Sequence, residues 1–488
     1  MEGVLEDRQL ELNRRGALKG IAAGTATLVA PTAYARIAKP KRYAIVGAGH
    51  RSRMYQDAIW GAHKATSHLV AVCDKNPGRA AYVQRRAADA GAAPPRTFLH
   101  TDFDKMLAET SPDVVIVTTP CAHHSEYIVR ALDAGRDVVT EKAMTTTAEE
   151  TQQVLDAARR NNRHVRVTFN YRYGPIRTQI KELLMSGAIG DVLSVDFHWL
   201  LDTVHGADYF RRWHSRKEIS GGLMVHKATH HFDLVNWWLS AMPVRVDATG
   251  KREFYTPGMA RRLGLSGYHE RCRTCTEKAA CSFYLDLAAN PSLKALYLEN
   301  EHYDGYFRDQ CVWRPEIDIE DTMNVIVGYD SGATLSYSLN ACNAWEGYSV
   351  AFNGTRGRLE HSLIERSFVT GTAPPPDDVK NASIRLYSLR EGSREIEPRL
   401  GDGSGHAGGD SVMLADLFGE HQLDPTLRAA DERAGAASCL IGIAANRCFT
   451  TGKPVLIDEL VTGLRRPDLA PMPTRADRVP MPPRPTAS

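Results

Sequence analysis

Short apolar runs rich in β-branched residues alternate with longer mixed stretches along the first third of the chain. Four such runs lie at residues 42–46, 68–73, 113–119 and 137–140. Apolar residues at successive positions are typical of a strand buried on both faces of a parallel sheet, and the stretches between the runs are long enough for crossover helices. The alternation predicts a doubly wound α/β domain, of the Rossmann type, over residues 36–163.

Beyond residue 164 the pattern changes to an alternation of apolar and polar positions, which is typical of antiparallel strands with one buried face. It predicts a C-terminal α/β domain over residues 164–463 with a large, open, mostly antiparallel sheet. Two segments are not needed by this sheet, an insertion at 252–315 and a Pro-rich tail at 464–488. The alternating runs lie at 192–199, 323–329, 333–339, 348–352 and 384–389.

A glycine turn follows the first apolar run. Gly47 allows a tight turn, and Gly49 lets the backbone approach a diphosphate. His50 and Arg51 open the next helix, whose free N–H groups attract negative charge. The second apolar run ends in Asp74, where a carboxylate can bond the ribose hydroxyls of a dinucleotide. Strand, turn, helix, strand and acid together predict an NAD site.

The carboxyl ends of parallel strands meet at one edge of a sheet, and ligands bind there. This topology brings Pro120 and Lys142, which end two later strands, to the edge that carries the glycine turn. The carboxylate of Asp74 repels a 2′-phosphate and favours NAD over NADP. Lys75 and Arg79 stand close to it in sequence and keep NADP open as an alternative.

The first 35 residues are typical of an export signal. Arg14-Arg15 precedes an apolar run of small residues at 20–30, and Ala33-Tyr34-Ala35 is typical of a cleavage site. We expect recognition by the twin-arginine export machinery and a periplasmic or secreted protein. The apolar run is too short for a stable membrane span. The net charge of +2, spread along 488 residues, gives no indication of nucleic-acid binding.

Five motifs, met in the same order, resemble those of the Gfo/Idh/MocA family of sugar and cyclitol oxidoreductases, and the export signal fits its periplasmic, glucose-fructose oxidoreductase-like branch. The resemblance implies a tightly bound nicotinamide cofactor, a sugar or glycoside as small-molecule partner, and a homodimer or homotetramer. It implies cofactor contacts from Thr119, Pro120, His124, Glu141, Lys142, Asn170 and Arg172. The motifs are Gly47-Ala48-Gly49, Thr119-Pro120-x-x-x-His124, Glu141-Lys142, Asn170-Tyr171-Arg172-Tyr173, and Gly221-Gly222 leading to His230 and Asp233.

The resemblance also implies an activity, the transfer of a hydride between nicotinamide and a secondary alcohol. Lys142 can stabilise charge on the reacting oxygen, and His230 can take its proton, because imidazole titrates near neutral pH. The sequence departs from the family pattern at Ala143, where proline is usual, and at His226, where aspartate is usual. Lys227 adds a second cation.

Two alternatives remain open at this stage. His226 and His230 would share a helix face at i, i+4, which suits a metal ion as well as proton transfer. A metal there would favour an NAD-assisted oxidation and elimination that cleaves a glycoside or epimerises a sugar. The other alternative is a non-catalytic, sugar-binding or scaffold protein that kept the nucleotide fold.

Four cysteines gather in the insertion. Cys272, Cys275 and Cys281 follow one another closely, and Cys311 comes later. Their spacing suits a tetrahedral zinc site or an iron–sulfur cluster. Because an exported protein meets oxidising conditions, disulfides such as Cys281 with Cys311 are an equal alternative.

Overall fold

The computed structural model describes residues 39–366, 381–401, 408–420, 423–473 and 475–484. Residues Pro40–Ser488 form one unit, separate from Met1–Lys39. The predicted export signal at 1–35 lies outside the described residues. No helix in the described ranges combines the length and the apolar character that a membrane crossing requires.

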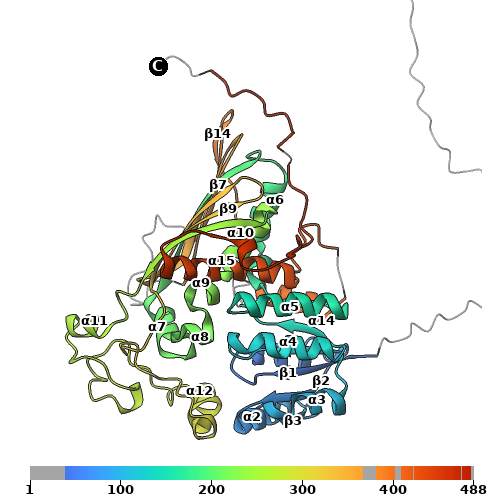
Figure 1. Ribbon diagram of the computed structural model, residues 1–488, viewed down its shortest axis with the longest axis vertical. Coiled ribbons are helices and arrows are strands. Elements are labelled where there is room, and N and C mark those ends of the chain that lie inside the picture. The colour runs from blue at the N-terminus through green and yellow to red at the C-terminus, as the bar shows by residue number, and fades with distance from the viewer. Residues whose placement is uncertain (1–38, 367–380, 402–407, 421–422, 474, 485–488) are drawn as a thin grey trace, which may run out of the picture. The chain divides into compact units, whose positions relative to one another are not determined.

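The N-terminal domain is built on a parallel sheet with six strands among the described residues, in the order β3-β2-β1-β4-β5-β6. Figure 1 shows it at the blue and cyan end of the colour range. The sheet includes Val165–Val167, past the predicted boundary at 163/164. Its strands are β1 (Lys41–Val46), β2 (Ser67–Asp74), β3 (Arg96–Leu99), β4 (Val114–Val117), β5 (Asp137–Thr140) and β6 (Val165–Val167). Its helices are α1 (Ser52–Trp60), α2 (Pro77–Asp89), α3 (Phe103–Thr110), α4 (His124–Asp133) and α5 (Ala148–Asn161).

Local sequence explains where several of these helices begin. Asn76 caps α2 by accepting the Arg79 N–H, and Pro77 occupies the first turn, where its missing donor costs nothing. Thr147 and Glu150 form a reciprocal capping box at the start of α5. The predicted doubly wound domain is confirmed.

The second sheet has nine strands in the part of the chain that the structure describes, in the order β14-β13-β12-β11-β7-β10-β9-β8-β15. Only β7 and β10 pair in parallel there, so the prediction of a mostly antiparallel sheet is confirmed. The strands are β7 (Val192–Asp202), β8 (Pro243–Lys251), β9 (Thr322–Tyr329), β10 (Thr334–Asn343), β11 (Glu346–Gly354), β12 (Gly357–Arg366), β13 (Ala382–Ser388), β14 (Gly392–Glu395) and β15 (Val455–Leu456).

Helices bury the inner side of this sheet and connect it to the first domain. Trp238 of α10 packs against Phe197 of β7 and Phe352 of β11, and α15 packs on β8. These helices are α6 (Pro175–Met185), α7 (Thr203–Arg211), α8 (Lys217–Ser220), α9 (Gly222–His226), α10 (Thr229–Leu239), α14 (Gly409–Phe418) and α15 (Glu432–Thr451).

The predicted insertion lies between β8 and β9 and contains three short helices among its described residues, α11 (Pro257–Arg262), α12 (Pro291–Leu296) and α13 (Glu301–Asp304). The Pro-rich tail is ordered where it meets the second domain. Ala470 is buried, and its carbonyl accepts the Ser240 hydroxyl at 2.6 Å. This part of the tail therefore packs on the fold.

Candidate active site

The glycine turn fits closely against the end of β4. Gly47 has φ +93°, and a Cβ atom there would lie 2.7 Å from the Thr118 backbone. Its N–H donates to the Cys73 carbonyl at 2.8 Å. A side chain at position 47 would meet both a positive φ and a backbone collision, so the turn requires glycine. A Cβ atom at Gly49 would make only one contact, at the ordinary distance of 3.5 Å, with the Tyr297 hydroxyl.

Asp74 lies directly beside this turn. One carboxylate oxygen accepts the Ala48 N–H at 2.6 Å, and the other accepts the Asn76 N–H at 2.7 Å and faces the Arg79 guanidinium. The glycine turn, the N-terminus of α1 and the carboxylate at the tip of β2 thus share one edge of the sheet. These residues fit an adenine dinucleotide, whose diphosphate would lie on the turn and whose ribose would face Asp74.

Arg51 and Glu141, both predicted to contact the cofactor, pair with each other. The Arg51 Nε donates to Glu141 at 2.6 Å, and the Tyr55 hydroxyl donates to the same oxygen at 2.7 Å. Burial of Glu141 raises the pKa of its carboxyl group. The charge of Arg51 outweighs this effect and holds that pKa below its usual range. This contact ties α1 to the end of β5 and so fixes Lys142 close to the glycine turn.

His124 joins the ends of two strands. Its ring nitrogens lie 2.8 Å from the carbonyl oxygens of Thr119 and Ala143. Thr119 and Pro120 follow β4, as predicted, and Ala143 follows Lys142. His124 therefore acts on the site by holding the two strand ends in position.

Asn170 and Arg172 bind within the protein. The Asn170 amide donates to Asp410 at 2.5 Å, and Asp410 also lies 3.9 Å from Arg51. Arg172 forms two hydrogen bonds to Asp233, at 2.6 and 2.7 Å, and both side chains are buried. The charge of Arg172 is thus neutralised inside the second domain, between the start of α6 and helix α10, and is not directed at the glycine turn.

Lys142 and His226 form the centre of the site. The Lys142 Nζ lies 3.4 Å from His226 Nε2 and donates to the His226 carbonyl at 3.1 Å. On the other side of the ring, His226 Nδ1 lies 3.1 Å from the Cys121 sulfur. A neutral imidazole with its proton on Nδ1 satisfies both contacts, because it donates to sulfur and accepts from the lysine.

Burial sets the protonation of these groups. Burial, reinforced by Lys227 and Arg51, lowers the pKa of Lys142 to about 8, although Cys121 and Glu141 oppose the shift. Burial and the nearby charge of Lys142 hold the pKa of His226 well below its usual range. Burial raises the pKa of the Cys121 thiol to about 12. Near neutral pH the site therefore combines a titrating lysine, a neutral imidazole and a protonated thiol.

Lys227 belongs to a second polar group beside the first. Its Nζ lies 3.4 Å from Glu346 and 4.5 Å from the centre of the Trp199 ring. Glu346 also contacts His205 Nδ1 at 2.9 Å, and the Tyr209 hydroxyl lies 3.2 Å from the other nitrogen of that ring. Glu346 and His205 come from β11 and α7, and no local motif indicates either of them.

His230 packs against the aromatic ring of Tyr171. The rings of His230 and Tyr171 stack with centroids 4.5 Å apart, and Lys227 Nζ lies 5.8 Å from the Tyr171 ring. The role of His230 as proton acceptor stays a prediction, whereas His226 is the histidine within hydrogen-bonding distance of Lys142.

His214 is a further histidine at the site. Its ring centroid lies 4.3 Å from that of His226, and burial lowers its pKa well below the usual range. Its Nδ1 is buried without a hydrogen-bond partner among the described residues. The only sequence signal for it is its place in an aromatic pair with Trp213, which suits a sugar site but is more common in cores.

The predicted i, i+4 pair of histidines is wrong. His226 ends α9, Thr229 begins α10, and Lys227 and Ala228 break the helix between them. His226 therefore turns to Lys142 while His230 turns to Tyr171. Across the described ranges, no group of three or more His, Cys, Asp or Glu side chains is arranged to hold a metal ion. The alternative of metal-assisted elimination loses its ligand pair.

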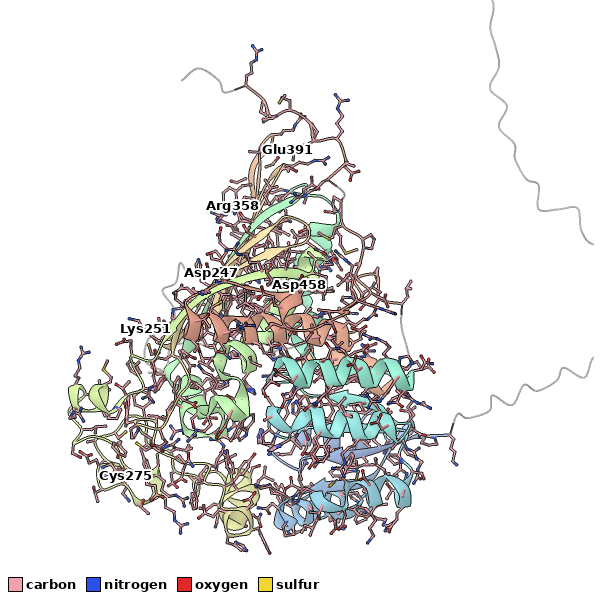
Figure 2. The ribbon with its side chains drawn as sticks, in the orientation of Figure 1. Asp247, Lys251, Cys275, Arg358, Glu391 and Asp458 are labelled. Atoms are coloured by element: carbon pink, nitrogen blue, oxygen red, sulfur yellow. The ribbon has the colours of Figure 1, made fainter. Side chains whose placement is uncertain are left out.

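The metal predicted in the insertion is not supported either. Cys272, Cys275, Cys281 and Cys311 do line one small cavity of about 20 Å³, and Figure 2 labels Cys275 there. However, the Arg211 guanidinium lies 3.4 Å from the Cys272 sulfur and brings positive charge to the place of a cation. All nine cysteines, each within the described residues, are free thiols.

Comparison with known proteins agrees with this architecture. A model described as an oxidoreductase family with an NAD-binding Rossmann fold matches residues 41–169, and the GFO/IDH/MocA C-terminal domain matches residues 178–360. YteT of Bacillus subtilis (strain 168), named as an oxidoreductase, is 38% identical over 400 residues, which are 80% of this chain and 92% of that protein. Inositol 2-dehydrogenase of Rhizobium meliloti (strain 1021) is 28% identical over 208 residues, 43% of this chain and 58% of that enzyme.

A solved structure shares the fold. Levoglucosan dehydrogenase in complex with NADH has a TM-score of 0.58 at 17% identity, and the match covers 86% of this chain and 99% of that chain. The family matches and the similarity to YteT cover both domains, so the alternative of a non-catalytic scaffold is replaced by that of an oxidoreductase. The chain belongs to the Gfo/Idh/MocA family of oxidoreductases and has an NAD-binding Rossmann domain.

Proposed function

We propose that this enzyme is an NAD-dependent dehydrogenase that oxidises a secondary alcohol of a sugar, glycoside or cyclitol. The contact between Lys142 and His226 next to the glycine turn carries the proposal, because it offers a titrating base where the nicotinamide end of a dinucleotide would lie. The relatives named inositol 2-dehydrogenase and levoglucosan dehydrogenase support the substrate class. Asp74 supports NAD over NADP.

The chemistry divides between cofactor and protein. NAD, held by the glycine turn and Asp74, would supply the acceptor for the hydride of the alcohol carbon. Lys142 in its neutral form takes the hydroxyl proton, which leaves a ketone and an ammonium group. His226 accepts a hydrogen bond from that ammonium, and its neutrality avoids a repulsive second charge. Lys227, paired with Glu346, would bond a further substrate hydroxyl.

A spectroscopic screen tests the proposed function. The purified full chain is mixed with NAD and a panel of sugars, methyl glycosides and inositols, and absorbance of the reduced nicotinamide is followed. We expect an increase with at least one member of the panel and no increase with Lys142→Met. Bound NAD that stays oxidised across the whole panel would contradict the proposal.

We also propose export by the twin-arginine route, on the basis of Arg14-Arg15 and the apolar run that follows. The change Arg14→Lys with Arg15→Lys is expected to retain the protein in the cytoplasm, because that route recognises the arginine pair rather than charge alone. Fractionation of expressing cells, followed by immunoblotting, measures the distribution. Lys19→Arg is the matched control and leaves export intact. Equal periplasmic amounts of the double variant and the unmodified chain would exclude this route.

A further inference from the structure

The insertion leaves the second sheet and packs on the nucleotide edge of the first domain. The Tyr297 hydroxyl accepts the His50 N–H at 3.0 Å, at the helix start where a diphosphate would bind. The Asn300 carbonyl accepts the Asn76 amide at 2.8 Å. Figure 1 shows α12 beside α2, and the two helices are in contact. The insertion thus forms one wall of the dinucleotide site.

A buried cluster of three charges lies in this wall. Arg79, in the first turn of α2, contacts Asp74 at 3.3 Å and also forms an ion pair with Asp304 at the end of α13. The side chains are nearly closed to solvent, with exposed fractions of 7% for Asp74, 10% for Arg79 and 3% for Asp304. Two carboxylates share one guanidinium, so the cluster carries a net charge of −1.

The position of this cluster decides what it can recognise. The acid at the tip of the second strand faces the adenosine ribose, and a nearby arginine is the group that accommodates the 2′-phosphate of NADP in such domains. Arg79 stands in that place. However, Asp304 already pairs with the Arg79 guanidinium. A 2′-phosphate would therefore face the net negative charge of this cluster at a position away from bulk water.

We propose that Asp304 is a specificity-determining residue through which the insertion makes the site select NAD over NADP. Asp74 alone would leave Arg79 half satisfied and available to phosphate, whereas Asp304 completes its pairing. The inference rests on the proposed function in one respect, that this edge binds a nicotinamide dinucleotide. It adds that the preference is set by a segment outside the Rossmann domain.

Binding measurements test the inference without reference to turnover. The full chain, freed of endogenous nucleotide, is titrated with NADH and NADPH, and their fluorescence gives the ratio of the two dissociation constants. Asp304→Asn frees Arg79 and is expected to shift the ratio toward NADPH by about tenfold or more. The gain is expected to vanish in Asp304→Asn with Arg79→Gln, because the guanidinium would hold the phosphate.

Three further variants separate charge from structure. Asp304→Glu keeps the carboxylate and should keep the original ratio, and so should Glu299→Gln, which removes an exposed carboxylate from the same segment. If Asp304→Asn does not fold, Asp304→Ser gives the same neutralisation. A ratio that stays within about twofold in the neutral variants, or a gain that survives loss of Arg79, overturns the inference. Failure of the unmodified chain to bind either nucleotide would instead refute the proposed function.

Discussion

Replacement of Lys142 by methionine is expected to lower kcat/KM for alcohol oxidation by about 10³-fold, within the range that general acid–base groups supply. Methionine fills similar volume but can neither take the hydroxyl proton nor bond the reacting oxygen. Initial rates at several substrate concentrations measure the effect. Lys105→Met, which changes an exposed lysine of α3, is the control and should leave the rate unchanged.

The pH dependence identifies the role of Lys142. The neutral amine is the active form in oxidation, so kcat/KM should rise with pH and level off above about 8, the pKa to which burial lowers this group. The reverse reduction needs the ammonium and should fall above the same pH. Lys142→Arg keeps a charge that does not titrate in this range, so both inflections should disappear. An inflection near 8 that persists in Lys142→Arg would assign the proton transfer to another group.

Replacement of Asp233 by alanine is expected to lower the free energy of unfolding by about 3–5 kcal/mol, because it leaves the Arg172 guanidinium buried without its partner. Urea denaturation followed by circular dichroism measures the loss. Glu395→Ala, which breaks the exposed pair with Arg385, should leave the free energy of unfolding nearly unchanged, because solvent and salt screen such pairs.

A double variant distinguishes the cause of that loss. Arg172→Met with Asp233→Leu removes both charges and keeps most of the buried volume, so it should recover most of the stability lost in Asp233→Ala. A double variant as unstable as the single one would mean that the pair contributes through its geometry. A single variant that loses less than about 1 kcal/mol would contradict the importance of the ion pair.

The first domain could be predicted from sequence because its determinants are local. Apolar runs, glycine and the acid at position 74 each act within a few residues, and the structure brings them together as expected. Val165–Val167 is too short to indicate which sheet it joins, and only its pairing with β5 decides this. Periodicity predicts a strand better than it predicts the strand's partner.

The site was harder to predict because its contacts span long distances in sequence. His226 and His230 are spaced like a helical pair, and nothing in Lys227-Ala228 marks the break between α9 and α10. Arg172 pairs with Asp233, which lies 61 residues later in the sequence. His50 forms a hydrogen bond with Tyr297, which lies 247 residues later. Such partners are fixed by the packing of whole elements, which a linear motif does not encode.

The two ends of the insertion face each other across a strand pair, since Lys251 of β8 lies opposite Thr322 of β9. The roughly seventy residues between them therefore form the connection of a single pair of antiparallel strands. The loop-closure entropy of such a connection costs only about 0.6 kcal/mol more for each doubling of its length. Residues could therefore be added to or removed from the insertion without a change in the pairing of β8 with β9. A chain with a plain turn between β8 and β9 would keep both sheets, but Asn76 and His50 would lose their contacts with Asn300 and Tyr297, and the nucleotide edge of the first domain would be exposed to solvent there.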